Sequence, residues 1–248
     1  MNSEQLFDEQ AKWLNSTAGR YLQNKEQALF DQAIVDVFGF NALQMGFSQL
    51  DLLRNSRIPN RYLAMDACSD AARYQICCCD DFLPFAEQSL DLLLLPHRLE
   101  FSSRPHQTLR EAERVLIHEG YLIISGFNPL STWGLAMRLS RSGTYPWSGN
   151  FIGLARMKDW LTLLGFEIVS MQTSCSIPPF EKQLWHKNFS FMDKLEASVF
   201  CGVYFIVAKK RVAGMTPLKP LWSGSSLKAG LVARPTQKDV SPHSFIDD

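Results

Sequence analysis

The stretch LDLLLL at residues 90–95 is the feature that most limits what this chain can fold into. A run this short and this apolar is typical of a strand covered on both faces, as in the middle of a parallel sheet. A turn built around Pro84 precedes it, and a helix-like segment follows at 103–120. Other strand-like runs occur at 40–45, 62–66, 74–79, 121–126, after Gly165 and at 200–210. Strands that alternate with helices predict an α/β fold, with helices on both faces of a parallel sheet.

The order of these segments gives a domain plan. Residues 1–39 read as a helical segment packing on the core, because Leu29, Ala33 and Val37 recur at helical spacing up to Gly39. Residues 40–210 form the main domain. Its last strand follows the previous one without room for a crossover helix, which predicts antiparallel insertion. Residues 211–248 carry prolines, Gly/Ser clusters and few large apolar residues, and we expect a flexible tail.

Two further helices are predicted from capping signals. Ser48 can cap a short helix over the segment SQLDLLRN, directly after the glycine at position 46. The segment 103–120 has Pro105 in its first turn and Gly120 as its stop.

Charge and composition set limits on partners and location. Lys plus Arg equals Asp plus Glu, 25 each, so the sequence has no strong nucleic-acid signal. The N-terminus does not resemble a signal peptide, and no run of 18 apolar residues predicts a membrane span. We therefore expect a cytoplasmic protein. Its six cysteines lack zinc-ligand spacing, so we expect buried thiols and no metal.

Acidic residues follow two successive predicted strands. Asp66 ends one, and Asp80 with Asp81 ends the next. Ligands of open parallel sheets bind at the carboxyl ends of the strands. A carboxylate in the first position can accept hydrogen bonds from ribose hydroxyls, and one in the second can accept from an adenine amino group. Both acids also suit an ordinary turn, and from the pattern alone the two interpretations remain open.

The segments DDFLPFAEQSLDLLLLPHRLEF and TLREAERVLIHEGYLIISGFNP resemble the class I S-adenosylmethionine-dependent methyltransferases, specifically the type 11 group. The resemblance covers about residues 40–170. It rests on the Leu-Pro-Phe turn at 83–85, the Ser-Leu-Asp opening of the following strand and the helix pattern Leu-x-Glu-x-x-Arg-Val-Leu at 109–116. It implies a Rossmann-like seven-stranded, mostly parallel sheet with an antiparallel last strand, and S-adenosylmethionine as cofactor.

The resemblance also implies roles for individual residues. Gly46, with Phe47 beside it, lies where the first loop of the family meets the methionine part of the cofactor. Asp66 corresponds to the ribose-binding acid. Asp80, next to Asp81, corresponds to the acid that binds adenine. The first loop departs from the family pattern, because it has one glycine where three are usual.

Four more positions follow from the same resemblance. Phe82 and Leu83 correspond to residues that line the adenine base. Pro96 and His97 correspond to the loop beside the transferred methyl group, which makes His97 the candidate general base for acceptors that must lose a proton. The alternative for His97 is that its imidazole only hydrogen-bonds the loop or stacks near the cofactor.

Three functions are compatible with these features. The first is a methyltransferase with a small-molecule or other unknown acceptor, selected by loops at 97–105, 127–150 and 175–192. The second is an inactive methyltransferase-like fold that serves as an interaction module, which the single glycine would favour. The third, another nucleotide-binding α/β enzyme, is disfavoured because the sequence has neither a Walker loop nor a GxGxxG motif.

Overall fold

The computed structural model of the chain describes residues 3–65, 75–139, 144–174 and 201–211. The chain divides into two compact units, residues 1–213 and 214–248, and the second lies outside the described residues, as does most of the predicted tail. Among the described residues, no helix has the length and apolar character that crossing a membrane requires. The cytoplasmic location stays a prediction.

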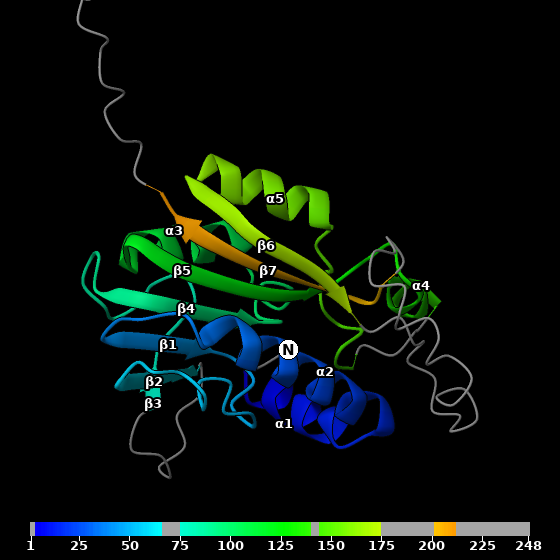
Figure 1. Cartoon of the computed structure of the whole chain (residues 1–248). Helices are drawn as coiled ribbons and strands as arrows, with labels where there is room; N and C mark the ends of the chain where they lie inside the picture. Colours follow the sequence, from blue (N-terminus) through cyan, green and yellow to red (C-terminus); the bar gives the residue numbers. More distant parts are fainter. Residues whose placement is uncertain (1–2, 66–74, 140–143, 175–200, 212–248) are drawn as a thin grey trace, which may run out of the picture. The chain divides into compact units, whose positions relative to one another are not determined.

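A seven-stranded sheet in the order β3-β2-β1-β4-β5-β7-β6 forms the centre of the first unit (Figure 1). The five strands from β3 to β5 in this order run parallel, and β7 pairs antiparallel with both β5 and β6. The predicted fold class and the antiparallel last strand are therefore confirmed. The strands are β1 (Asn41–Met45), β2 (Asn60–Met65), β3 (Gln75–Cys77), β4 (Leu90–Pro96), β5 (Leu116–Phe127), β6 (Phe166–Ser174) and β7 (Val203–Lys210).

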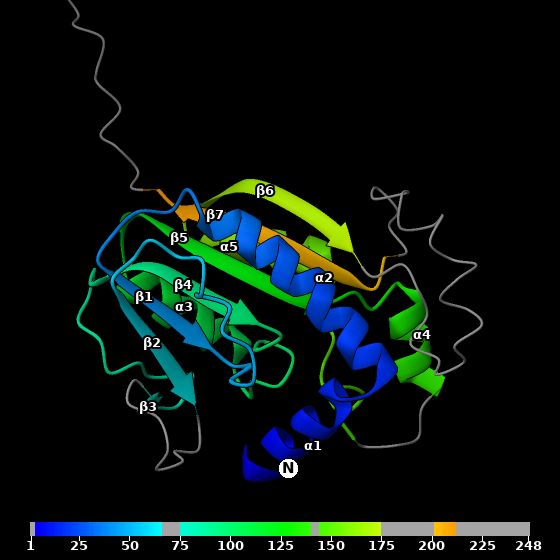
Figure 2. The ribbon, with the colours of Figure 1, turned by 60° about the horizontal axis from the view of Figure 1, so that its bottom comes forward.

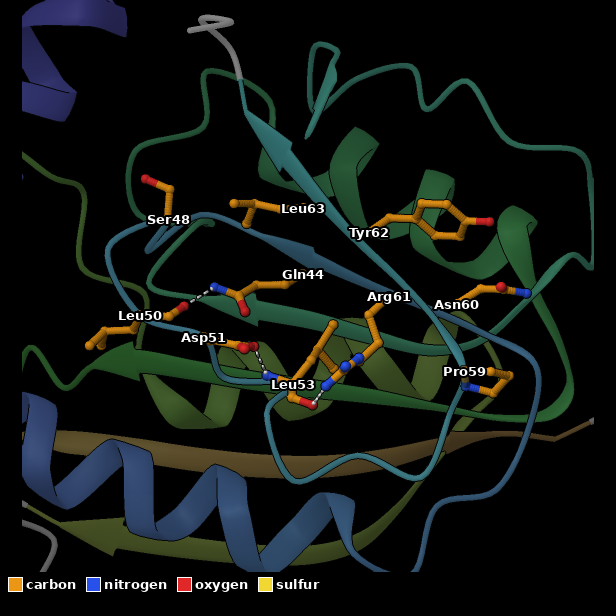
Figure 3. Close-up of a pocket in the computed structure, with 10 residues that line it drawn as sticks. All are labelled: Gln44, Ser48, Leu50, Asp51, Leu53, Pro59, Asn60, Arg61, Tyr62 and Leu63. Atoms are coloured by element: carbon orange, nitrogen blue, oxygen red, sulfur yellow. Dashed lines mark hydrogen bonds between the residues drawn. The ribbon is translucent and has the colours of Figure 1, made fainter. Parts of the chain in front are cut away.

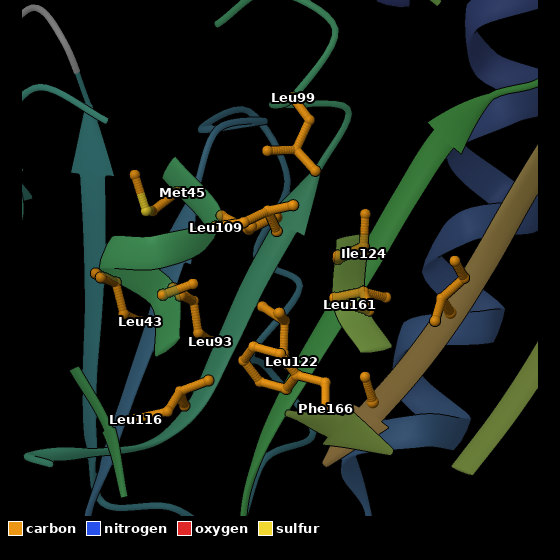
Figure 4. Packing of buried hydrophobic residues seen from close by; sticks show 14 of the residues in the cluster. Leu43, Met45, Leu93, Leu99, Leu109, Leu116, Leu122, Ile124, Leu161 and Phe166 are labelled. Carbon is orange, nitrogen blue, oxygen red and sulfur yellow. The ribbon is translucent and has the colours of Figure 1, made fainter. Parts of the chain in front are cut away.

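Five helices are described: α1 (Ser3–Leu14), α2 (Thr17–Ile34), α3 (Pro105–Val115), α4 (Thr132–Leu139) and α5 (Leu154–Leu163). Alternate residues of β4 divide the core between the two faces of the sheet. Leu92 and Leu94 pack in a cluster with side chains of α2, which crosses one face in Figure 2. Leu93 and Leu95 pack with side chains of α3 and α5 in a second cluster, shown in Figure 4. The run at 90–95 is thus a central strand covered on both sides.

Two helices end earlier in the sequence than predicted. The helix predicted to reach Gly39 ends at Ile34, because the carboxylate of Asp91 accepts hydrogen bonds from the backbone N–H groups of Phe40 and Asn41 and holds this segment to the start of β4. The helix predicted to stop at Gly120 ends at Val115, since the next residue already pairs with β4.

The predicted helix after Ser48 is wrong. All of residues 46–59 are described, and they form turns that lead from β1 to β2. The amide nitrogen of Gln44 donates to the backbone carbonyls of residues 46, 47 and 50, at 3.0, 3.1 and 2.8 Å. Carbonyls bound to this side chain are drawn toward β1 and do not form the ladder of a helix that would begin there. The crossover from β1 to β2 therefore has no helix.

Candidate functional site

The loops that follow β1, β3 and β4 end at one side of the sheet, which we call the carboxyl edge. These loops and the last residue of β4, Pro96, include every predicted site residue except Asp66, which follows β2 and lies outside the described residues. The parallel order of these strands brings the remaining residues to the same edge. The prediction of one common edge follows from the confirmed fold; the role of each residue stays a prediction.

Gly46 is held in a conformation that a side chain would strain. Its φ is +93°, and a Cβ atom at this position would lie 3.3 Å from the carbonyl oxygen of Pro96 and 3.7 Å from Cδ of Arg98. Glycine adopts this backbone conformation without cost, and other residues rarely do. The loop thus approaches the end of β4 closely, and the approach depends on the missing side chain.

Phe47 also has a positive φ, 46°, but its ring is directed into the protein. It is fully buried in the core cluster on the α2 side, and its centroid lies 5.3 Å from that of His97. A left-handed conformation in an aromatic residue is strained and persists only where the surroundings hold it. Because the ring is in the core, its bulk does not fill the open side of the first loop.

The side chain of Gln44 binds the backbone of this loop and fixes its shape, a role that was not predicted from the sequence. Besides its three donated hydrogen bonds, its side-chain oxygen accepts from the backbone N–H of Leu52 at 3.0 Å. Its side chain is therefore satisfied although the residue is only 2% exposed. The available signal was a single amide inside an apolar strand, because a polar side chain buried at such a position must bind its neighbours.

His97 lies in a buried charge cluster with Glu26 and Glu100, here called the His97 cluster. Its Nε2 is 2.8 Å from Oε1 of Glu26, and its Nδ1 is 3.2 Å from Oε1 of Glu100. The ring packs against Phe127, with centroids 4.0 Å apart. Burial by itself lowers the pKa of His97, but the charge of Glu26 and the hydrogen bond to Glu100 outweigh it and raise the pKa to about 10.

This geometry does not suit the role of general base predicted for His97. The side chain is fully buried, both nitrogens face carboxylates, and a pKa near 10 keeps the ring protonated at neutral pH. A base must be unprotonated and within reach of the acceptor. Of the alternative, the hydrogen bond within the loop is present, to Glu100, and the ring also binds Glu26 on α2. Within the described residues, Oε2 of Glu26 and Oε2 of Glu100 have no hydrogen-bond partner.

Glu26 and Glu100 were not predicted from the sequence. Glu26 lies on the buried stripe of α2, between Leu22 and Phe30 at the i and i+8 positions, so an acid within an apolar stripe was the available signal. Glu100 also accepts a hydrogen bond from the backbone N–H of Phe127 at 2.7 Å. No local pattern marks that contact.

The acidic turn after β3 contains both buried and exposed side chains. Asp80 is 8% exposed, and its Oδ1 accepts a hydrogen bond from Nε of Arg98 at 2.6 Å. Asp81 is more exposed and lies 3.8 Å from Arg104. Phe82 is 73% exposed, whereas Leu83 is buried in the core cluster on the α3 side. Phe82 thus has an open face for a base, and Leu83 in this position does not line one.

The helix α3 holds this turn in place. The backbone N–H of Leu83 donates to Glu111 at 3.1 Å, and Arg114 donates to the carbonyls of Leu83 and Phe85, each at 3.0 Å. Arg114 also donates to Glu111, and this hydrogen bond lowers the pKa of the Glu111 carboxyl. The Glu-x-x-Arg part of the helix pattern therefore serves to position the Leu-Pro-Phe turn.

A separate pocket of about 470 Å³ lies where β1 and β2 meet the crossover between them (Figure 3). Its described lining includes Gln44, Ser48, Asp51, Arg61 and Leu63, from the two strands and the turns that connect them. None of the predicted site residues that the structure describes lines it. Among the described residues, no group of three or more His, Cys, Asp or Glu side chains is arranged to hold a metal ion.

Comparison with known proteins agrees with this fold. Residues 50–124 match the family model described as "Methyltransferase domain". That match begins after β1, so it does not include Gly46 or Phe47. The uncharacterized protein YafS of Escherichia coli K12 is 38% identical over 140 residues, which are 56% of this chain and 55% of YafS. The matched stretch thus spans about half the length of that relative.

Several solved structures share the fold at low sequence identity. A chain of the complex between the Haloferax volcanii Trm112 methyltransferase activator and the putative methyltransferase has a TM-score of 0.63 and 13% identity, over 86% of this chain and 99% of that one. A possible histamine N-methyltransferase from Thermotoga maritima has a TM-score of 0.55 and 16% identity, over 77% and 97%. The [4+2]-cyclase SpnF has a TM-score of 0.55 and 18% identity, over 76% and 80%.

Proposed function

We propose that this chain is an S-adenosylmethionine-dependent methyltransferase that acts in the cytoplasm on a small-molecule or other unknown acceptor. The methyltransferase-domain match at residues 50–124 and the fold support this proposal. The fold alone does not carry it, because SpnF, which shares the fold, is described as a [4+2]-cyclase. The observation that carries it is the close backbone approach at Gly46, on the edge where Asp80 also lies.

The described residues fit this cofactor at two points. Gly46 leaves a space that a Cβ atom would fill, and the ring of Phe47 beside it is buried in the core. These features give the amino-acid end of the cofactor access to the backbone at the end of β1. Asp80 offers a carboxylate to the adenine amino group, and the exposed ring of Phe82 offers a surface for the base. Asp81, Pro96 and Asp66 complete the proposed binding set.

The chain would contribute alignment of acceptor and methyl donor and exclusion of water. Bound S-adenosylmethionine supplies a methyl group that is already activated on a sulfonium sulfur. Holding two reactants in line accounts for a large share of the acceleration of such a displacement. We give His97 a positioning role in this proposal, because the His97 cluster links α2 to the end of β4. Its charged, buried ring is not available to take a proton from an acceptor.

The alternative function, an inactive interaction module, is favoured by one specific observation. Oδ1 of Asp80 already binds Arg98, so one oxygen of the proposed adenine acceptor has a partner within the chain itself. A protein that does not bind the cofactor could keep such a pair permanently.

Isothermal titration calorimetry with S-adenosylhomocysteine separates the two functions. We expect micromolar binding to the full chain, and a loss of at least tenfold in Gly46→Ala, because the added Cβ enters the close approach to Pro96. Gly165→Ala is the matched control. The φ of Gly165 is +80°, so an alanine at this position, just after α5, is under a similar backbone strain. We expect it to bind within twofold of the wild type. Absence of binding at millimolar ligand in every form of the chain would overturn the proposal.

A further inference from the structure

The side chain of Arg98 connects three loops of the carboxyl edge. It follows the end of β4, its Cδ is the side-chain atom closest to the Cβ position of Gly46 after β1, and its Nε and Nη2 both bind Oδ1 of Asp80 after β3. In the sheet, β1 and β2 lie between β4 and β3. The Arg98–Asp80 pair therefore links the loop after β4 to the loop after β3. These are the outer two of the four neighbouring strands whose carboxyl ends carry the proposed cofactor site.

This ion pair is shielded from water. The side chains of Arg98 and Asp80 are 15% and 9% exposed. The neighbouring pair of Arg104 and Asp81 differs: Arg104 is 75% exposed and the charges are 3.8 Å apart. Exposed pairs are screened and contribute little, whereas partly buried pairs with short hydrogen bonds are held more strongly. The Arg98–Asp80 pair thus holds the loops of the carboxyl edge together more strongly than the Arg104–Asp81 pair does.

The pair also competes chemically with the proposed ligand. Two donors of a guanidinium already bind one oxygen of Asp80. An adenine amino group would offer this carboxylate a neutral donor, whereas the guanidinium offers two N–H donors that carry a positive charge. A ligand that takes Oδ1 of Asp80 must therefore displace Arg98 from this oxygen, and its apparent Kd rises by the reciprocal of the fraction of molecules in the open state.

We propose that Arg98 is a gate on the cofactor site: binding of S-adenosylmethionine and the Arg98–Asp80 ion pair exclude each other. This inference rests on the proposed function, because it concerns the same ligand and the same edge. It makes Arg98 the residue that sets the cofactor affinity of this chain. The close approach at Gly46 remains available to the ligand once the arginine side chain has moved.

The test compares the full-length wild type with Arg98→Met, which removes the guanidinium and keeps a long apolar side chain. S-adenosylhomocysteine is titrated into each protein by calorimetry, and circular dichroism confirms that the variant is folded. We expect Arg98→Met to bind at least tenfold more tightly, since binding no longer opens an ion pair. Arg110→Met is the matched control: it removes the same charge from an exposed position on α3, and we expect its Kd to stay within twofold.

The possible outcomes distinguish this inference from the proposed function. Binding to Arg98→Met alone, or much tighter binding to it, supports both. Binding to the wild type that is unchanged or weaker in Arg98→Met overturns the gate and leaves the proposed function intact; weaker binding would make Arg98 a contact of the ligand. Absence of binding to both proteins at millimolar ligand overturns the gate and the proposed function together.

Discussion

Nε2 of His97 lies 2.8 Å from Oε1 of Glu26, so an imidazole at the end of β4 binds a carboxylate of α2 across 71 positions of sequence. The φ of His97 is 47°, a left-handed conformation that a non-glycine residue adopts at a cost. The two carboxylates of the His97 cluster hold the residue in this conformation from opposite nitrogens of its ring. The cluster therefore connects the amino-terminal helices to the carboxyl edge of the sheet.

Removing the charge of Glu26 tests the strength of this connection. Glu26→Gln keeps the shape of the side chain but leaves the charge of His97 buried against a single carboxylate, and breaking a buried pair in this way costs about 3 kcal/mol of unfolding free energy. Urea denaturation measures the loss. Asp31→Asn is the control on the same helix, because its pair with Arg54 is exposed; we expect a much smaller change. Equal losses of unfolding free energy in the two variants would show that the buried cluster stabilises the fold no more than the exposed pair does.

The pKa of His97 predicts how stability depends on pH. The pKa rises from its ordinary value of 6.5 to about 10 in the folded chain, so the folded state binds the proton more tightly than the unfolded state. The stabilisation is fully present below pH 6.5 and is lost as the pH rises toward 10, by at most about 1.4 kcal/mol per unit. Urea denaturation from pH 6 to pH 9 should show this decline in the wild type but not in His97→Gln. If the unfolding free energy changes with pH in the same way in both proteins, this role of His97 is contradicted.

Much of the fold was predictable because its signals are local. The apolar run at 90–95 predicted a central strand, and antiparallel insertion of the last strand was predicted as well; both are confirmed. The second prediction assumed a short link before the last strand, but residues 175–202 separate β6 from β7. The predicted helix after Ser48 is wrong because a side-chain contact, the Gln44 amide on the carbonyls of residues 46, 47 and 50, decides the shape of that loop. Propensity is a weak guide where such contacts are made.

The candidate site was predictable only in part, for a related reason. The parallel order of strands brings Gly46, Asp80 and His97 to one edge. This arrangement can be predicted from the strand pattern alone. What each side chain does there depends on partners distant in sequence. Glu26 converts His97 from a candidate base into a buried cation, and Arg98 engages Asp80. Neither partner has a spacing to these residues that a motif could reveal.

The contacts of Arg114 predict a loss of stability when its guanidinium is removed. Arg114→Met deletes hydrogen bonds to two backbone carbonyls and to Glu111, and we expect unfolding to become easier by roughly 2 kcal/mol. The turn at 82–85 should also exchange its amide protons faster, which hydrogen–deuterium exchange measures. Arg110→Met, from an exposed position on the same helix, should leave both quantities nearly unchanged. Normal protection of the turn in Arg114→Met would refute this role of α3.

Removing the amide of Gln44 should have a large effect on the crossover, because this one side chain contacts four of its backbone groups. Gln44→Leu is similar in size but leaves the N–H of Leu52 and the carbonyls of residues 46, 47 and 50 without this partner. Each buried group that loses its hydrogen bond costs about 1–3 kcal/mol, and relaxation of the turns recovers part of this, so we expect a total of roughly 3 kcal/mol.

Urea denaturation and amide exchange at Leu52 measure the effect of Gln44→Leu. Gln172→Leu, at an exposed position of β6, is the matched control and should change neither. If Gln44→Leu keeps the protection of the Leu52 amide, then another group holds the crossover and the close approach at Gly46 does not depend on Gln44. If protection is lost together with cofactor binding, the amide of Gln44 is what keeps the first loop in the shape on which the proposed site depends.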